Sequence, residues 1–248
     1  MSELRILVIE HEEDAGPKRF GAWLVEAGAE VVVLRPYRGD EIPADLDGFS
    51  ALLVLGGSAG PFEDTVNPWL PQVRVLLQRS AAGAFPSFNI CLGGELLAAA
   101  TSTRVIRRQR PQIGIYDLHT TSAGEQDPVF AAIAGEQGET IPAVLFHQEE
   151  MELPDGAELL LTGSDAPIQG YRVGEFAWGT QFHPESDAAQ VAQWLRADPL
   201  RLPEGKTDDS ITAEVAEADA DLIRINRALA HSFVDFLRRR PVDRPAAV

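Results

Sequence analysis

Short apolar runs alternate with amphipathic segments along the first hundred residues of the chain. The runs are rich in Val, Ile and Leu, which is typical of strands buried on both faces of a parallel sheet. The segments between them carry apolar residues at helical spacing; one ends at Gly28 and another has Pro68 near its start. The pattern predicts strands at residues 4–9, 30–34, 51–55 and 84–90, and helices at 16–28, 67–82 and 92–100. This alternation predicts an α/β fold with a flavodoxin-like open, mostly parallel sheet flanked by helices.

The middle of the chain, from about residue 104 to residue 182, has a different pattern. Short strand-like segments separated by turns replace the alternation of strand and helix, and Gly174-Glu175 resembles a hairpin turn. The strands are predicted at residues 113–121, 143–146, 158–162, 168–173 and 176–181. We therefore expect a smaller antiparallel portion beside the parallel sheet, followed by a helix at residues 186–196.

A polar, proline-containing connector separates the last predicted helix of this region from a long amphipathic segment. We expect a main domain at residues 1–197, a linker at 198–209 and a helical extension at 210–248, whose tail after Arg240 frays. The helix, at about residues 210–239, has one apolar stripe, which we expect to cover the main domain. The alternative is that it covers a second copy of the chain in a homodimer. The stripe consists of Ile211, Val215, Leu222, Ile225, Leu229, Phe233, Phe236 and Leu237.

Composition and charge argue against several classes of function. The 248 residues carry a formal net charge of −17, which repels phosphate backbones and argues against nucleic-acid binding. The arginine-rich segment at residues 104–110 is interpreted as a solvated rim. No apolar run approaches the roughly 20 residues of a membrane helix, and the N-terminus lacks signal-peptide features, so we expect a cytoplasmic location. The single cysteine, Cys91, excludes a disulfide framework and a cysteine-rich metal site, and no cofactor is implied.

Cys91 lies where an apolar strand runs directly into a helix, in the segment FNICLGGELLA. This is the layout of a nucleophile elbow, a sharp turn that exposes a reactive side chain. Gly93 and Gly94 let the backbone pass close to a substrate. The helix N-terminus is expected to favour the thiolate, and the thiolate would form a thioester with an acyl group.

His183 and Glu185 follow another predicted strand, in the segment GTQFHPES. A cysteine hydrolase needs a base for the thiol and a carboxylate that orients this base. The spacing of two residues places both side chains on one face, and Pro184 stiffens the turn. The pair therefore supplies the base and the orienting carboxylate that Cys91 would require as a nucleophile.

A glycine-rich loop, LGGSAGP, follows the predicted strand at residues 51–55. Backbone N–H groups of Gly57 or Ser58, together with that of Leu92, would stabilise an oxyanion. A phosphate-binding loop is the competing interpretation, but the Walker spacing with its lysine is absent. All three segments lie at the ends of strands, where open α/β sheets bind their ligands.

The chain at this point resembles the class I, triad-type glutamine amidotransferase family, in particular stand-alone proteins similar to the amidotransferase domain of GMP synthase. The matching blocks are LLVLGGSAG, NICLGGELLAAA and TQFHPES, with weaker matches at PQIGIYDL and LFHQEEMELPDGAELL, and together they span about residues 50–190. The resemblance implies that Cys91 is the nucleophile, His183 the general base and acid, and Glu185 the orienting residue. It also implies an oxyanion hole at Gly57, Ser58 and Leu92 and substrate contacts at Gly56, Glu95, Gly114, Ile115 and Tyr116.

Three positions depart from the family pattern. Asn89 stands where the family has Gly, and Gly94 where it has His, Gln or another side chain. Glu95 stands where the family has a Gln that holds the amino-acid end of glutamine. An ionised carboxylate only accepts hydrogen bonds, so we hypothesise that Glu95 disfavours free glutamine and redirects the enzyme towards another γ-glutamyl compound. His147 lies in one of the weaker blocks and is interpreted as a hydrogen-bonded structural histidine.

The resemblance implies hydrolysis of glutamine, or of a related γ-glutamyl amide, to a carboxylate and ammonia or an amine. The ammonia would pass to a separate synthase subunit, or the enzyme would be a plain γ-glutamyl peptide hydrolase. A catalytically silent or partner-activated regulatory subunit of the same fold is a third interpretation. A signalling receiver domain is a fourth, suggested by the acidic start, but the third strand ends in Gly56-Gly57 instead of the phospho-accepting Asp.

Overall fold

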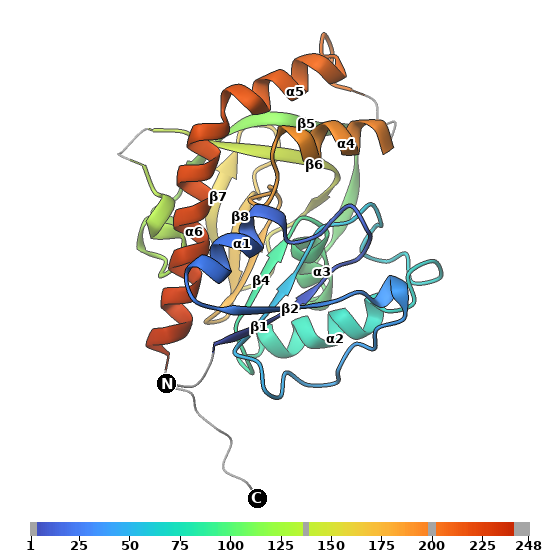
Figure 1. Ribbon diagram of the computed structural model, residues 1–248, viewed down its shortest axis with the longest axis vertical. Helices are drawn as coiled ribbons and strands as arrows, with labels where there is room; N and C mark the ends of the chain where they lie inside the picture. The colour runs from blue at the N-terminus through green and yellow to red at the C-terminus, as the bar shows by residue number, and fades with distance from the viewer. Residues whose placement is uncertain (1–3, 136–138, 198–201, 241–248) are drawn as a thin grey trace, which may run out of the picture.

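The computed structural model describes residues 4–135, 139–197 and 202–240 (Figure 1). Within these ranges the strands form one mixed sheet in the order β2-β1-β3-β4-β9-β8-β7-β5-β6. The strands are β1 (Arg5–Ile9), β2 (Glu30–Leu34), β3 (Ala51–Val54), β4 (Ser87–Ile90), β5 (Val105–Thr120), β6 (Ile141–Met151), β7 (Glu158–Gly163), β8 (Gly170–Val173) and β9 (Ala177–Thr180). The α-helices are α1 (Lys18–Glu26), α2 (Leu70–Ala81), α3 (Leu92–Ala100), α4 (Ala188–Ala197), α5 (Asp208–Glu217) and α6 (Asp219–Arg239).

The α/β class is confirmed, but the expectation of a mostly parallel, flavodoxin-like open sheet is not. The pairs β1–β2, β1–β3, β3–β4 and β4–β9 are parallel. The pairs β8–β9, β7–β8, β5–β7 and β5–β6 are antiparallel, so the antiparallel half extends the same sheet and is not a smaller appendage. The reason is that β5 and β6 are longer than predicted and pair along most of their length.

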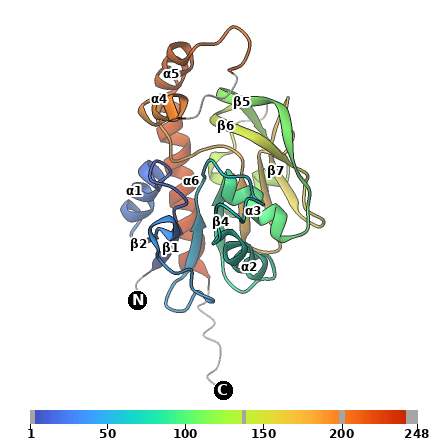
Figure 2. The ribbon, with the colours of Figure 1, turned by 90° about the vertical axis from the view of Figure 1, so that its right-hand side faces the viewer.

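Helices cover both faces of the parallel half, as Figures 1 and 2 show. Strand β1 illustrates how the sequence produces this: Ile6 and Val8 belong to one apolar cluster, while Leu7 and Ile9 belong to another on the opposite face. The first cluster includes residues of α1 and α6, and the second includes residues of α2 and α3. A continuous apolar strand is therefore buried on both sides.

The C-terminal segment forms two helices and not the single predicted one. Helix α5 begins at Asp208, inside the predicted linker, and a turn at Ala218 separates it from α6. The stripe covers the main domain, as expected: Leu229 and Phe233 are fully buried in the cluster that contains β1 and β4. Residues 198–201 of the predicted linker and the tail after Arg240 lie outside the described residues.

The arginine-rich segment is part of β5 and not a rim after a helix. Strands β5 and β6 pair antiparallel, which sets its arginines opposite the acidic run of β6. Arg107 pairs with Glu149 at 3.3 Å, and Arg108 with Glu150 at 2.5 Å. These cross-strand ion pairs neutralise the segment that was the best candidate for binding a phosphate backbone.

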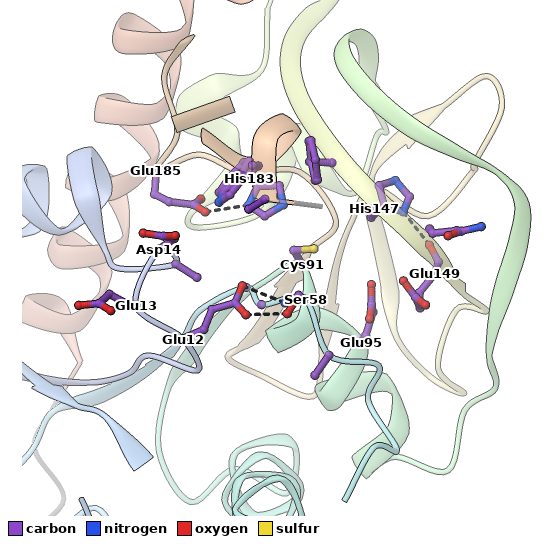
Figure 3. Close-up of a pocket in the computed structure, with 18 of the residues that line it drawn as sticks. Glu12, Glu13, Asp14, Ser58, Cys91, Glu95, His147, Glu149, His183 and Glu185 are labelled. Carbon is purple, nitrogen blue, oxygen red and sulfur yellow. Dashed lines mark hydrogen bonds and ion pairs between the residues drawn. The ribbon is translucent and has the colours of Figure 1, made fainter. Parts of the chain in front are cut away.

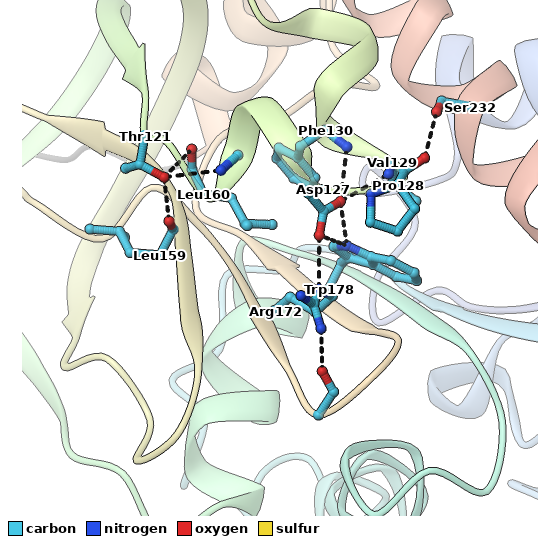
Figure 4. Close-up of polar contacts among 12 residues, drawn as sticks. Thr121, Asp127, Pro128, Val129, Phe130, Leu159, Leu160, Arg172, Trp178 and Ser232 are labelled. Carbon is cyan, nitrogen blue, oxygen red and sulfur yellow. Dashed lines mark hydrogen bonds and ion pairs between the residues drawn. The ribbon is translucent and has the colours of Figure 1, made fainter.

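The carboxylate of Asp127 connects the antiparallel half of the sheet to α6 (Figure 4). Asp127 is buried and accepts hydrogen bonds from the backbone N–H groups of Val129 and Phe130 at 2.9 and 3.0 Å. It also accepts from Arg172 Nε at 2.8 Å and Trp178 Nε1 at 3.0 Å, on β8 and β9. This joins the β8–β9 hairpin to the 3₁₀ turn η3 (Phe130–Ile133), against which α6 packs.

Among the described helices, none combines the length and apolar character needed to cross a bilayer.

We expect Asp127→Ala to lower the free energy of unfolding by about 3 kcal/mol or more, because it leaves several buried donors and one arginine without their acceptor. Urea unfolding followed by circular dichroism measures this. Asp117→Ala is the matched control: Asp117 is exposed on β5, so its loss should change the free energy by less than about 0.5 kcal/mol. Equal effects of the two substitutions would refute the assigned role of Asp127.

Candidate active site

Cys91 lies in the sharp turn between β4 and α3 that the sequence predicts. Its backbone has φ 50° and ψ −108°, a conformation that residues other than glycine rarely adopt. The Cys91 N–H donates to Thr180 O of β9 at 2.8 Å, which holds the turn against the neighbouring strand. The helix then passes so close to β3 that a Cβ at Gly93 would lie 2.3 Å from Val54 O. Only glycine therefore permits this approach.

His183 and Glu185 form a buried pair beside Cys91. His183 Nδ1 lies 2.7 Å from Glu185 Oε1, and both side chains are about 5% exposed or less. A Cβ at Gly56 would lie 3.1 Å from His183 Cε1 and 3.5 Å from Cys91 Cβ, so the histidine and the cysteine meet over this glycine. His183 Nε2 is buried without a hydrogen-bond partner among the described groups, which leaves it available to a thiol or a leaving group.

A pocket of about 400 Å³ opens over these residues (Figure 3). Its walls come from the loop after β1, the loop after β3, the start of α3, strand β6, the segment after β9 and helix α4. The lining includes Glu12, Glu13, Asp14, Gly56, Gly57, Ser58, Cys91, Glu95, Arg107, Phe146, His147, Glu149, His183, Glu185 and Trp194. Carboxylates thus outnumber the arginine, which makes the pocket acidic.

This setting keeps Cys91 protonated in the resting protein. Burial raises the pKa of the Cys91 thiol well above its usual range, and the charges of Glu95, Glu185 and Glu149 raise it further. The Leu92 N–H at the start of α3 acts in the opposite direction and is outweighed. The expectation that the helix N-terminus favours the thiolate is therefore corrected, because desolvation by burial is the largest cause and any ionised carboxylate nearby adds to it.

Glu95 is buried inside the protein at 2% exposure and accepts a hydrogen bond from Gln181 Nε2 at 2.9 Å. Burial raises its pKa to about 8, which the hydrogen bond from Gln181 partly opposes and the charge of Glu149 reinforces. Glu95 is consequently a neutral carboxylic acid at neutral pH. At neutral pH Glu95 therefore has no negative charge that would repel the carboxylate of free glutamine.

The glycine-rich loop meets the pocket as predicted, but one of its donors is already used. The carboxylate of Glu12 accepts from the Ser58 N–H at 3.0 Å and from Ser58 Oγ at 2.6 Å (Figure 3). Gly57 lies against Leu92: a Cβ on Gly57 would be 3.2 Å from Leu92 Cδ2. Because Glu12 already uses the Ser58 N–H, the backbone N–H groups of Gly57 and Leu92 remain the predicted oxyanion donors.

The structure does not bring Gly114, Ile115 and Tyr116 to the described pocket. Gly114 and Ile115 lie on β5 against α5, where a Cβ at Gly114, with φ +115°, would be 3.6 Å from Ile211 Cγ2. Tyr116 packs instead against the cluster that contains β1 and β4. Their role as substrate contacts stays a prediction that follows from the resemblance; in the structure, helix α5 covers Gly114 and Ile115. The sequence predicts a helix that contains Ile211, but not which strand this helix covers.

His147 accords with its interpretation as a structural histidine, although it also lines the pocket. Its Nδ1 lies 2.6 Å from Glu149 O and its Nε2 2.9 Å from Gln112 Oε1. Burial lowers its pKa to about 3, so the ring stays neutral. Asn89, one of the departures, is also structural: its Nδ2 donates to Trp178 O of β9 at 2.7 Å.

Sequence reasoning missed three residues that line the pocket, Glu12, Glu149 and Trp194, and one buried neighbour of Cys91, Gln181. The Trp194 ring packs on His183 with centroids 4.6 Å apart. Gln181 belongs to the same block as His183, and Glu149 to an acidic run whose pattern favours a solvent-facing position. Their roles depend on which strands become neighbours, which a single sequence does not reveal. Within the described ranges, no group of three or more His, Cys, Asp or Glu side chains is arranged to hold a metal ion.

Comparisons with known proteins show the family and the fold of the chain. The family model described as glutamine amidotransferase class-I matches residues 21–197, more than half of the chain. The chain is 26% identical to the glutamine amidotransferase-like protein YfeJ of Salmonella typhimurium over 82% of this chain and 84% of that protein. It is 26% identical to a GMP synthase of Porphyromonas gingivalis over 60% of this chain but only 27% of the synthase. It is 28% identical to gamma-glutamyl peptidase 4 of Arabidopsis thaliana, over 57% of this chain and 55% of the peptidase.

Solved structures show the same fold. A glutamine amidotransferase of Thermotoga maritima superposes with a TM-score of 0.80 at 23% identity, covering 94% of this chain and 99% of that one. A glutamine amidotransferase of Methylobacillus flagellatus has a TM-score of 0.80 at 22% identity, covering 100% of this chain and 99% of that one.

The raised pKa of Glu95 predicts how Glu95→Gln changes stability with pH. Between pH 4.5 and about 8 the carboxyl is ionised in the unfolded chain but protonated in the folded protein. The wild type therefore loses stability as pH rises through this window, by up to about 1.4 kcal/mol per pH unit from this group. The uncharged amide removes that loss, so the stability gained by Glu95→Gln should grow across the window and level off above it.

Urea unfolding of both proteins across this pH range measures the difference. The matched control is Glu152→Gln, which neutralises an exposed carboxylate near the end of β6. A stability difference for Glu95→Gln that does not change with pH would show that Glu95 ionises normally in the folded protein.

Proposed function

The chain belongs to the class-I glutamine amidotransferase family, and we propose that it hydrolyses the side-chain amide of glutamine or of a related γ-glutamyl compound, with Cys91 as nucleophile. One observation carries the proposal: a buried cysteine in a strained strand-to-helix turn meets a histidine–carboxylate pair inside a pocket. Each part has a use in acyl transfer, and together they supply the nucleophile, the base and its orienting group.

The reaction begins with a neutral thiol. The Cys91 proton moves to His183 Nε2 as the sulfur attacks the amide carbon, and the oxygen of the tetrahedral intermediate becomes negative. The backbone N–H groups of Gly57 and Leu92 then stabilise this oxygen. Glu185 holds His183 at Nδ1 and stabilises the imidazolium that forms.

The leaving nitrogen takes the proton from His183 as the carbon–nitrogen bond breaks, which leaves a γ-glutamyl thioester on Cys91. Water then attacks the thioester and gives its proton to His183 Nε2. The proton returns to the sulfur as the carbon–sulfur bond breaks, which restores the thiol and releases a γ-carboxylate. The raised pKa of Cys91 makes the proton transfer to His183 part of the reaction and not a step completed beforehand.

The relatives suggest two fates for the nitrogen. The GMP synthase of Porphyromonas gingivalis and one subunit of the GMP synthase of Sulfurisphaera tokodaii are among them, which supports transfer of ammonia to a separate synthase protein. A gamma-glutamyl peptidase is also among them, which supports release of an amine from a γ-glutamyl peptide. A neutral Glu95 is compatible with free glutamine, so we favour glutamine and treat the peptide as the second candidate.

The test is release of ammonia and glutamate from glutamine, and of the amine from a panel of γ-glutamyl amides. Cys91→Ala should lower the rate by at least about a thousandfold, because it removes the nucleophile. Glu185→Gln should lower kcat by about a hundredfold or more, because it disturbs the orientation of His183. Glu175→Gln, an exposed carboxylate in the β8–β9 turn, is the matched control and should leave the rate unchanged.

Release that persists in Cys91→Ala would exclude the cysteine mechanism. No release from any compound, together with a Cys91 that a glutamine-analogue alkylator does not modify, would instead assign the chain to the silent or partner-activated subunits. Preference for glutamine over the γ-glutamyl amides would separate the amidotransferase from the peptidase.

A further inference from the structure

Gln181 bridges the nucleophile and the buried acid. Its Nε2 lies 2.9 Å from Glu95 Oε1 and 3.8 Å from Cys91 Sγ. Glu95 follows Cys91 by one turn of α3, which places both on the face of the helix start that meets the end of β9. All three residues are at most 5% exposed, so water does not satisfy their polar atoms.

The bridge leaves one atom without a partner. Gln181 Oε1 is buried and has no hydrogen-bond donor among the described groups. A protonated Glu95 carries an O–H that can donate to it. A carboxylic acid and a primary amide then form two antiparallel hydrogen bonds, from the amide N–H to the acid and from the acid O–H to the amide oxygen. These two bonds close a hydrogen-bonded ring, and the second N–H of the amide points out of it.

We propose that Glu95 keeps its proton in the active enzyme and pairs with Gln181 as acid with amide, so that Gln181 directs its second N–H at the Cys91 sulfur. This inference rests on the proposed role of Cys91 as nucleophile. It makes Glu95 and Gln181 positioning residues for the thiol. An acid in this state has both a hydrogen-bond donor and an acceptor.

The surroundings of Glu95 favour the protonated form. Glu149 of β6 adds negative charge, and its own partner is Arg107 of β5. From β8, Tyr171 donates its hydroxyl to Gly94 O at 2.6 Å, and its pKa is raised well above the usual range by burial and then by Glu95. His147 is neutral. Among the described residues of the pocket, the cation is Arg107, and it pairs with Glu149 and not with Glu95.

The proton matters for catalysis because an ionised Glu95 would oppose the thiolate. After burial, the charge of Glu95 is the largest cause that raises the pKa of Cys91. With Glu95 neutral this repulsion disappears, and the Gln181 N–H donates to the sulfur as it becomes negative. The proton that leaves the thiol still goes to His183; the proton on Glu95 stays where it is throughout.

Alkylation of the thiol by iodoacetamide tests the proposal directly, because Cys91 is the single cysteine of the chain. The rate is measured against pH for the wild type, for Glu95→Gln and for the control Glu152→Gln. We expect the ratio of the Glu95→Gln rate to the wild-type rate to be constant below about pH 7. Above pH 8 it should rise by about tenfold, because the wild type then acquires a charge beside the thiolate.

A ratio that stays constant over the whole range would overturn the proposal, whether Glu95 is ionised throughout or its charge does not reach the sulfur. A second readout is the infrared C=O stretch of a protonated carboxyl. In the wild-type minus Glu95→Gln difference it should be present at neutral pH and vanish as pH passes about 8. Its absence at neutral pH would also overturn the proposal.

Gln181→Met tests the other half of the pair. It keeps the volume but removes the N–H, so alkylation of Cys91 at neutral pH should slow by about tenfold. Gln169→Met is the matched control, because Gln169 is equally buried but its Nε2 donates to Ala166 O and Gln112 and not to the sulfur. Equal rates for wild type and Gln181→Met would exclude a positioning role for Gln181.

These experiments need no substrate, so they separate the two proposals. If alkylation follows the expected pH dependence but no amide is hydrolysed, the acid–amide pair stands and the proposed function fails. If amides are hydrolysed but the alkylation ratio is flat, the function stands and the acid–amide pair fails.

Discussion

The parallel pairing of β4 with β9 is the constraint on which the site depends. The register sets Ile90 beside Thr180, so the chain leaves both strands at the same edge of the sheet, with Cys91 after one and His183 after the other. The bond from the Cys91 N–H to Thr180 O continues this pairing into the strained turn. A shift of one residue would turn the two side chains to different faces, and the nucleophile would lose its base.

Several features serve to hold this pairing in place. Asn89 adds a side-chain hydrogen bond to β9, where a glycine would add none. The glycines after Cys91 let α3 start directly against the backbone of β3 and β9, where a Cβ at Gly94 would lie 2.6 Å from Thr180 O. On the far side, Asp127 ties β9 and β8 to the turn that supports α6. The long C-terminal helix is thus part of the structure that positions the site, although it is remote from the chemistry in the sequence.

The sequence predicts the parallel half well because each of its strands is an apolar run and each functional segment follows a strand. The sequence predicts the antiparallel half less well, because part of it is held by charged residues. The first part of β5 is rich in arginines, two of which pair with acids of β6, and this charged segment lacks the apolar alternation that marks a strand. The break between α5 and α6 at Ala218 also leaves no signal, since alanine favours a continuous helix. Cys91, His183 and Glu185 come from motifs, whereas Glu12 and Glu149 reach the pocket only through the way the strands are arranged.

The electrostatics of the pocket explain why the reactivity of Cys91 depends on which of the neighbouring groups carry a proton. A thiolate in a buried, acidic pocket is unfavourable, so a resting ion pair between Cys91 and His183 would lack stabilisation from the surrounding charges. A neutral thiol with a neutral Glu95 avoids placing negative charges side by side, and leaves Glu185 to stabilise the histidine only once it has accepted the proton. In the proposed reaction the charge develops together with the bond to the substrate, and the predicted oxyanion donors, the N–H groups of Gly57 and Leu92, would share it. An acidic pocket is therefore compatible with a cysteine nucleophile, provided that the buried carboxyl group of Glu95 retains its proton.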